Sequence, residues 1–278
     1  MPAIVLIPAR YASTRFPGKP LCHLFGKPLI QHVYERAGRA SRIRDVFVAT
    51  DSEAIFETVR QFGGSAIMTS EHHQSGTDRI AEAVNLLRRE GYPVGAADII
   101  VNVQGDEPMI EPGMVDEVVQ IMDDGRASIG TLVRKIDSAE DLIDPNVVKA
   151  VFSEGGFALY FSRAPVPYDR DMFHISRKQG RGDLTGKGKG CVTALISVPR
   201  PDAVTLYKHI GIYAYRPDVL ERLSGLQPSR LERIEKLEQL RALENGLAIK
   251  VKETTYETIG VDTPEDLERV IQCLSTSS

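Results

Sequence analysis

Short β-branched runs alternate with helical patterns through the first half of the 278-residue chain, and this alternation limits the possible folds more than any other feature. Strands are predicted at residues 4–7, 46–49, 66–68 and 99–103. Helices are predicted at residues 29–40, 53–62, 78–89 and 112–122. Because the strand-like runs are continuously apolar, we expect an α/β fold with a mostly parallel sheet covered by helices on both faces.

The second half of the chain predicts mixed structure. Strands are expected at residues 147–152, 158–161, 210–215 and 249–252, and helices at residues 230–244 and 264–274. No long helical pattern separates the first two strands, which favours antiparallel pairing. We therefore expect one domain over residues 1–278, with a smaller mixed β subdomain at residues 147–216. Within it, the Gly- and Lys-rich residues 174–200 are interpreted as a mobile surface insertion.

Charge and cysteine content exclude several classes of protein. The formal net charge is −4, whereas a protein that binds nucleic acid or an anionic membrane over its whole surface is usually basic. Cys22, Cys191 and Cys273 are far apart and form no CxxC pair, so no disulfide framework or zinc site is predicted. The apolar run before Pro8 is too short for a signal peptide or a membrane span. We expect a cytoplasmic protein without nucleic-acid or membrane partners.

A cationic loop follows the first predicted strand. Arg10, Arg15 and Lys19 supply positive charge, while Ser13 and Gly18 offer hydroxyl and backbone donors. In an open α/β sheet, ligands bind beyond the carboxyl ends of the strands, where this loop begins. Arginine forks and a lysine ammonium suit a polyphosphate, although the pattern is not that of a Walker A loop. The alternative is an ordinary solvated basic loop.

Carboxylates mark two further candidate positions. Asp106 and Glu107 end a buried apolar strand, and adjacent carboxylates there favour a divalent cation such as Mg²⁺, unless they only form a turn that faces solvent. Asp262 precedes a predicted helix, at which Thr263 is the expected N-cap and Asp266 part of a capping box. Asp262 could join Asp106 on one metal ion, but the sequence spacing does not show that they meet.

Two other stretches place polar residues where they could contact a ligand. Residues 72–79 form a polar, glycine-containing loop before a helix, which suits an anion or the edge of a nucleotide base. In residues 209–215, alternation places His209 and Tyr213 on one side of a strand. Glu238 and Gln239 lie on the long predicted helix, and their spacing alone is that of an ordinary exposed helical face.

Taken in order, these motifs resemble those of the 3-deoxy-D-manno-octulosonate (Kdo) cytidylyltransferases, also called CMP-Kdo synthetases. The resemblance covers nearly the whole chain and rests on IPARYASTRFPGKPL, HHQSGTDRIAE, VNVQGDEP, ALYFSRAPVPY, HIGIYAY, LEQLRALENG and GVDTPEDLERV. It implies the three-layer fold of nucleotide-diphospho-sugar transferases and a homodimer. It also implies a Mg²⁺-dependent reaction in which CTP and Kdo give CMP-Kdo and pyrophosphate for lipopolysaccharide synthesis.

The resemblance assigns roles to individual residues of this chain. It implies that Lys19, Arg15, Asp106 and Asp262 are catalytic, with Asp106 and Asp262 binding magnesium. Residues implied to bind the nucleotide are Ala9, Arg10, Ser13, Arg15, Lys19, Ser75, Gly76 and Thr77. Residues implied to surround the sugar acid are Arg79, Gln104, His209, Tyr213, Glu238 and Gln239.

Two alternatives remain open at this point. A sister enzyme, such as a CMP-sialic acid synthetase or a sugar-1-phosphate nucleotidyltransferase, would share the N-terminal loop but lack the combination of HIGIYAY with LEQLR. A noncatalytic nucleotide-binding protein could have the same fold, because fold does not imply function. The presence of both Asp106 and Asp262 argues against that second alternative.

Overall fold

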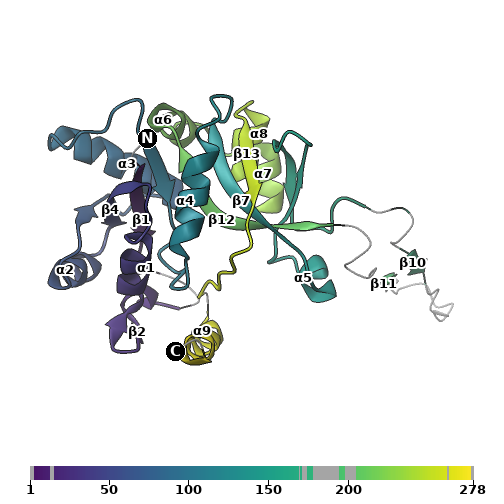
Figure 1. The fold of residues 1–278 in the computed structure, drawn as a ribbon, viewed down its shortest axis with the longest axis horizontal. Coiled ribbons are helices and arrows are strands. Elements are labelled where there is room, and N and C mark those ends of the chain that lie inside the picture. Colours follow the sequence, from purple (N-terminus) through teal and green to yellow (C-terminus); the bar gives the residue numbers. More distant parts are fainter. Residues whose placement is uncertain are drawn as a thin grey trace, which may run out of the picture.

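A central β-sheet organises the molecule (Figure 1). The computed structural model describes residues 3–12, 16–168, 170, 174–177, 194–197, 205–261 and 263–276. The strands of the central sheet are β1 (Ala3–Ala9), β4 (Ile43–Thr50), β5 (Ala66–Met68), β6 (Ile99–Asn102), β7 (Ile129–Lys135), β8 (Lys149–Phe152), β9 (Ala158–Ser162), β12 (Tyr207–Tyr215) and β13 (Ile249–Glu253). Their order is β13-β7-β12-β6-β1-β4-β5, with β8 paired to β12 and β9 to β8.

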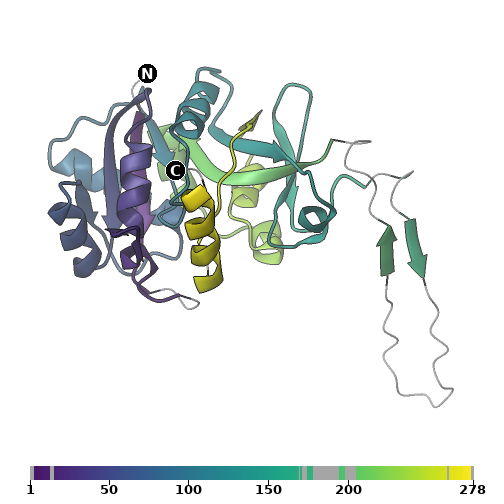
Figure 2. The same ribbon diagram turned by 60° about the horizontal axis from the view of Figure 1, so that its bottom comes forward.

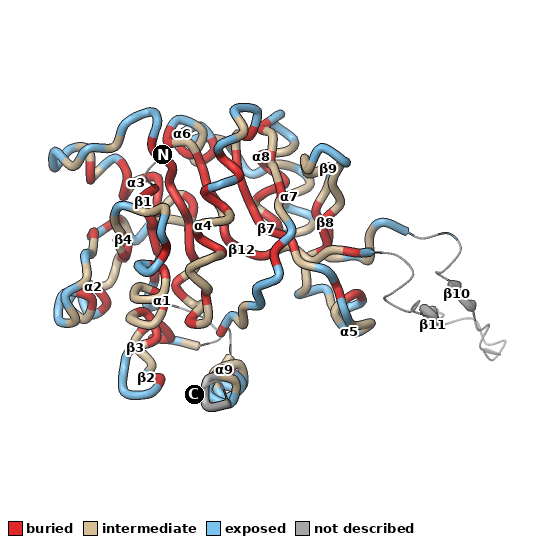
Figure 3. Tube along the Cα trace, viewed as in Figure 1, coloured by how far each residue is buried: buried red, intermediate tan, exposed pale blue. Residues whose placement is uncertain are grey.

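Helices cover both faces of this sheet. They are η1 (Lys19–Leu21, a 3₁₀ turn), α1 (Leu29–Ala37), α2 (Glu53–Gln61), α3 (Gly76–Arg89), α4 (Pro112–Ile121), α5 (Ala139–Ile143), α6 (Pro217–Ser224), α7 (Arg230–Glu235), α8 (Gln239–Glu244) and α9 (Pro264–Thr276). Side chains of β1 alternate between two apolar clusters, with Val5 in one and Leu6 in the other. The first cluster includes residues of α1, α2, α4 and α9, and the second includes residues of α3, α6 and α8. Figure 2 shows helices on both sides of the sheet, and Figure 3 shows buried residues along its central strands. The predicted three-layer α/β architecture is confirmed.

Most of the predicted elements are present, with ends displaced by a few residues. One prediction was wrong: the expected long helix at residues 230–244 is two helices, α7 and α8. Lys236 ends α7 in the left-handed region, with φ of 55°, and the buried Leu237 follows it. Strand β7 and helices α5 and α6 had not been predicted.

The second half of the chain joins the sheet through antiparallel pairs. Strands β8 and β9 pair antiparallel, as predicted. Strand β12 is antiparallel to β6, β7 and β8, whereas β1, β4, β5 and β6 run parallel. Within residues 174–200, β10 (His174–Arg177) pairs antiparallel with β11 (Ala194–Ser197). The rest of that segment lies outside the described residues, and its mobility and the subdomain boundaries at 147 and 216 stay predictions.

Strand β1 lies at the point where the order of the sheet reverses. The chain passes from β1 to β4 and β5 on one side, and then returns to β6 on the other side of β1. Loops leaving β1 and β6 therefore diverge, and such a point is where open α/β sheets bind ligands. No helix in the described part of the chain is long and apolar enough to cross a membrane.

Candidate active site

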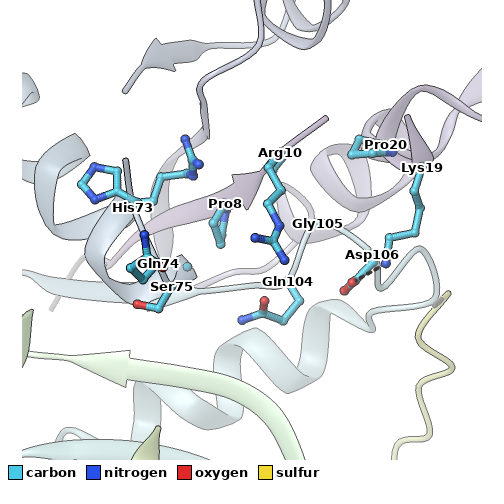
Figure 4. A pocket seen from close by; sticks show the side chains of 13 residues that line it. Pro8, Arg10, Lys19, Pro20, His73, Gln74, Ser75, Gln104, Gly105 and Asp106 are labelled. Carbon is cyan, nitrogen blue, oxygen red and sulfur yellow. Dashed lines mark hydrogen bonds and ion pairs between the residues drawn. The ribbon is translucent and has the colours of Figure 1, made fainter. Parts of the chain in front are cut away.

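A cavity of about 250 Å³ opens at the carboxyl ends of β1 and β6 (Figure 4). Lys19 and Asp106 lie at one end, His73, Gln74 and Ser75 at the other, with Arg10 and Gln104 between them. Predicted site residues that line it are Ala9, Arg10, Lys19, Ser75, Gly76, Arg79, Gln104 and Asp106. Ser13, Arg15 and Asp262 lie outside the described residues. The cavity therefore brings together the predicted nucleotide loop and one predicted metal ligand.

The cationic loop turns back toward the sheet at Gly18. Gly18 has φ of 70°, a conformation that side chains with a Cβ rarely adopt, and its N–H donates to the Tyr11 carbonyl at 3.0 Å. This turn directs Lys19 inward, where the residue is only 8% exposed. Arg10 remains exposed at the cavity. Among its described residues, the loop thus presents one fixed and one solvent-accessible cation.

Asp106 forms an ion pair with Lys19 at one end of the cavity. The Lys19 ammonium Nζ lies 2.7 Å from Asp106 Oδ2, and the Asp106 side chain keeps 35% exposure. The preceding Gly105 allows this approach, because a Cβ there would lie 2.8 Å from the Pro8 carbonyl oxygen. The next carboxyl, Glu107, has its pKa raised to about 8 by desolvation and by the charge of Asp106. The side chains of Asp106 and Glu107 are both half-buried, and it is Asp106 that pairs with Lys19 in the cavity.

The segment that leads to Asp262 lies beside Asp106. Val261 donates its backbone N–H to the Asp106 carbonyl at 2.8 Å, although the two residues are distant in sequence. On the other side of Asp262, Thr263 and Asp266 exchange hydrogen bonds: the Thr263 N–H donates to Asp266 Oδ2 at 3.0 Å, and the Asp266 N–H to Thr263 Oγ1 at 3.3 Å. The predicted capping box is confirmed.

One helix face of α3 braces the loop that forms the far wall of the cavity. Arg79, 4% exposed, donates to Asp51 Oδ2 at 2.6 Å and to Thr69 Oγ1 at 2.7 Å. One turn later, Glu82 accepts from the Ser70 N–H at 2.8 Å and pairs with His73 at 2.6 Å. Arg79 was expected beside the sugar acid. In this structure it lines the cavity and also holds the loop to the end of β4.

Three of the remaining predicted residues line a small second recess, of about 20 Å³. Tyr213, Glu238 and Gln239 line this recess together with Tyr215 and apolar neighbours. The His209 ring packs at 5.2 Å from the rings of both Phe161 and Tyr213. Desolvation lowers the pKa of His209 to about 3, so the imidazole is neutral near pH 7 and its Nε2 pairs with Thr131 Oγ1 at 3.0 Å.

Glu238 connects the recess with the cavity. Ser75 Oγ donates to Glu238 Oε1 at 3.1 Å, and Thr77 Oγ1 donates to Oε2 at 2.7 Å. Interpreting Glu238 and Gln239 as an exposed helical face was wrong, since Gln239 is 8% exposed. The physical reason is the break at Lys236, which starts a new helix and changes which residues face inward.

Sequence reasoning missed several polar residues that support the site. Asp51 anchors Arg79, while Asn102 hydrogen-bonds to the hydroxyl of Tyr215, which the predicted residue Thr77 also contacts. A signal existed for Asp51 and Asn102, because both stand at or just beyond the end of a parallel strand. Nothing local distinguishes Tyr215 from other strand tyrosines.

Oxygen donors at this edge suit a magnesium ion. Among the described side chains, no three His, Cys, Asp or Glu residues gather as a metal cluster. Mg²⁺ needs only one or two protein carboxylates, because substrate phosphates and water complete its coordination. Asp106 is an accessible carboxylate of this kind, and the chain beside it continues into Asp262. The residues present fit the ion.

Comparisons with known proteins agree with the geometry. A family model described as cytidylyltransferase matches residues 4–254. The 3-deoxy-manno-octulosonate cytidylyltransferase of Thermodesulfovibrio yellowstonii is 51% identical over 278 residues, covering 100% of each chain, so residues 174–200 lie inside the aligned region.

Solved structures give the same result for the fold. The structure of CMP:2-keto-3-deoxy-manno-octonic acid synthetase complexed with CTP aligns with a TM-score of 0.82 and 40% identity, covering 100% of both chains. A 4-diphosphocytidyl-2C-methyl-D-erythritol synthase shares the fold at a TM-score of 0.60 and 12% identity, covering 99% of this chain and 100% of the other. The chain is therefore an enzyme that belongs to the cytidylyltransferase family and, within it, to the 3-deoxy-manno-octulosonate cytidylyltransferases.

Proposed function

We propose that this enzyme transfers CMP from CTP to the anomeric hydroxyl of Kdo, releasing CMP-Kdo and pyrophosphate. The observation that carries the proposal is the cavity, in which Lys19 faces Asp106 and the N-terminus of α3 forms the opposite wall. A relative with 40% identity is described in complex with CTP. A homodimer, a cytoplasmic location and a role in lipopolysaccharide synthesis are further proposals, supported by the family resemblance.

In nucleotidyl transfer, some residues of the site would bind and position the substrates and others would neutralise phosphate charge. Lys19 and Arg10 face the space for a triphosphate, and Arg15 is proposed to join them. Fixed cations lower the barrier because they stabilise the charge that develops on departing pyrophosphate without reorganising. Ser75, Gly76 and Thr77 are proposed to hold the cytosine through backbone groups at the start of α3. Arg79, Gln104, His209, Tyr213, Glu238 and Gln239 are proposed to hold the sugar acid close to the α-phosphorus.

Asp106 and Asp262 are the residues that we propose to hold Mg²⁺. When bound, the ion would neutralise phosphate charge and acidify the attacking hydroxyl. Asp106 contributes an accessible carboxylate, and the Lys19 ammonium, 2.7 Å from Asp106 Oδ2, orients it. No protein base is assigned to the sugar hydroxyl.

The test is pyrophosphate release from CTP with Kdo, sialic acid or hexose 1-phosphates, with Mg²⁺ or with chelator. We expect turnover with Kdo and Mg²⁺, and loss of about 10³-fold in Asp106→Asn and in Asp262→Asn, each still folded by circular dichroism. Asp123→Asn, which alters only an exposed pair with Arg42, is the matched control and should turn over normally. Selective use of a hexose phosphate, or normal turnover in Asp106→Asn, would contradict the proposal.

A further inference from the structure

Glu238 lines the second recess and also contacts Ser75 and Thr77, two of the residues proposed to hold the cytosine. Its carboxylate accepts one hydroxyl proton on each oxygen, from Ser75 at 3.1 Å and from Thr77 at 2.7 Å. Both donors belong to the first turn of α3, whereas Glu238 precedes α8 in the other half of the chain. We propose that Glu238 is a positioning residue for the nucleotide, so that CTP affinity depends on it even when no sugar acid is present.

The hydrogen-bond chemistry explains how the carboxylate fixes this wall. A serine hydroxyl has one proton and two lone pairs. Because the proton of Ser75 goes to Glu238, a lone pair remains for the Asp78 N–H, which donates to Ser75 Oγ at 3.1 Å. The N-cap of α3 is thereby held in one orientation, and with it the free N–H groups of the first turn.

The surroundings hold the Glu238 carboxylate in place. Arg241 NH2 lies 3.7 Å from Glu238 Oε1, while the same guanidinium is fixed by Glu232 at 2.5 and 2.8 Å. Desolvation raises the pKa of Glu238, and the hydrogen bond from Thr77, the charge of Arg241 and the hydrogen bond from Ser75 oppose this rise. Charge and hydrogen bonds from two helices therefore converge on one carboxylate.

The same carboxylate has capacity left for the sugar acid. An ionised carboxylate offers about four lone-pair sites, and Ser75 and Thr77 use two of them. The inference rests on the proposed function, because it takes CTP and a sugar acid as the two ligands on either side of Glu238. It predicts that one residue contributes to the affinity for both substrates.

Calorimetric titration of CTP with Mg²⁺ into the full-length protein, without sugar, tests the inference. Glu238→Gln keeps the size but removes one acceptor and the charge, so CTP should bind about five- to tenfold more weakly. Thr77→Val, which removes the hydroxyl, should weaken CTP binding similarly. Thr77→Ser, which keeps the hydroxyl, should bind CTP within about twofold of wild type. The double variant Glu238→Gln with Thr77→Val should bind CTP less weakly than the product of the two single losses predicts, because both changes act on the contact between Glu238 and Thr77.

Glu235→Gln is the matched control. Glu235 lies on α7 and also accepts a serine hydroxyl, from Ser162 at 2.7 Å, but it contacts β9 instead of α3. This variant should bind CTP within about twofold of wild type. If Glu238→Gln binds CTP as tightly as wild type while its KM for the sugar acid rises, Glu238 serves the sugar alone and the inference is wrong. If wild type itself does not bind CTP, the proposed function fails instead.

Discussion

We expect the ion pair between Arg79 and Asp51 to stabilise the wall of the cavity, and its contribution to the free energy of unfolding can be measured. The side chains are 5% and 18% exposed, and the guanidinium NH2 lies 2.6 Å from Asp51 Oδ2. Asp51→Asn removes the negative charge without changing any residue that lines the cavity. Breaking one side of a buried pair costs about 3 kcal/mol, because the remaining charge stays desolvated. For a chain of this length, that loss lowers the melting temperature by about 6 °C.

Thermal unfolding followed by circular dichroism measures the shift. The control is Glu35→Gln, which removes the charge from the pair with Lys27; that pair is also 2.7 Å long, but its side chains are 45% and 32% exposed. The free energy of unfolding of this control should stay within about 0.5 kcal/mol of wild type. In a double-mutant cycle of Asp51→Asn with Arg79→Met, the combined loss should fall short of the sum by about 2 kcal/mol. Equal melting temperatures for Asp51→Asn and Glu35→Gln would refute the reasoning.

His209 and Lys149 give two further predictions. Burial lowers the pKa of His209 to about 3 in the folded protein, below its value in the unfolded chain. As the pH drops below about 6.5, the unfolded state therefore binds a proton that the folded state does not bind. The free energy of unfolding should fall between about pH 6.5 and pH 4, by at most about 1.4 kcal/mol per pH unit. Urea unfolding at several pH values measures this slope, and an unchanged slope in His209→Gln would contradict the assignment. Lys149 is 0% exposed and donates to the Asp144 and Val147 carbonyls at 2.8 and 2.6 Å. Lys149→Met should therefore lower stability by about 3 kcal/mol, against little change for the exposed control Lys27→Met, and equal melting temperatures for the two would count against a structural role of Lys149.

The sequence predicted the parallel half of the fold well, because strands buried on both faces must be continuously apolar. Strand β7 was missed, since Gly130 interrupts its pattern. Packing favours that glycine, because a Cβ there would lie 3.2 Å from the Ile121 side chain on α4, closer than ordinary contact. The break between α7 and α8 was missed for a different reason, because Lys236 adopts a left-handed conformation that its residue type does not indicate.

The part of the site whose residues are close together in the sequence could be predicted. The loops at Arg10–Lys19 and Gln104–Asp106 each follow a strand, so topology alone places them at one edge. The role of Glu238 could not be derived this way, because its contacts with Ser75 and Thr77 join segments from opposite halves of the chain. Only the resemblance to a known family indicated that Glu238 belongs to the site.

Strand β12 has a consequence for how the enzyme can move. Its nine residues pair with β8 at one end, with β7 along most of their length and with β6 at the other end. The strand that carries His209 and Tyr213 is therefore hydrogen-bonded to the strand that leads to Gln104 and Asp106. Rotating one half of the molecule against the other would break that ladder, so the pairing of β12 holds the two halves of the sheet together as one rigid floor beneath the cavity.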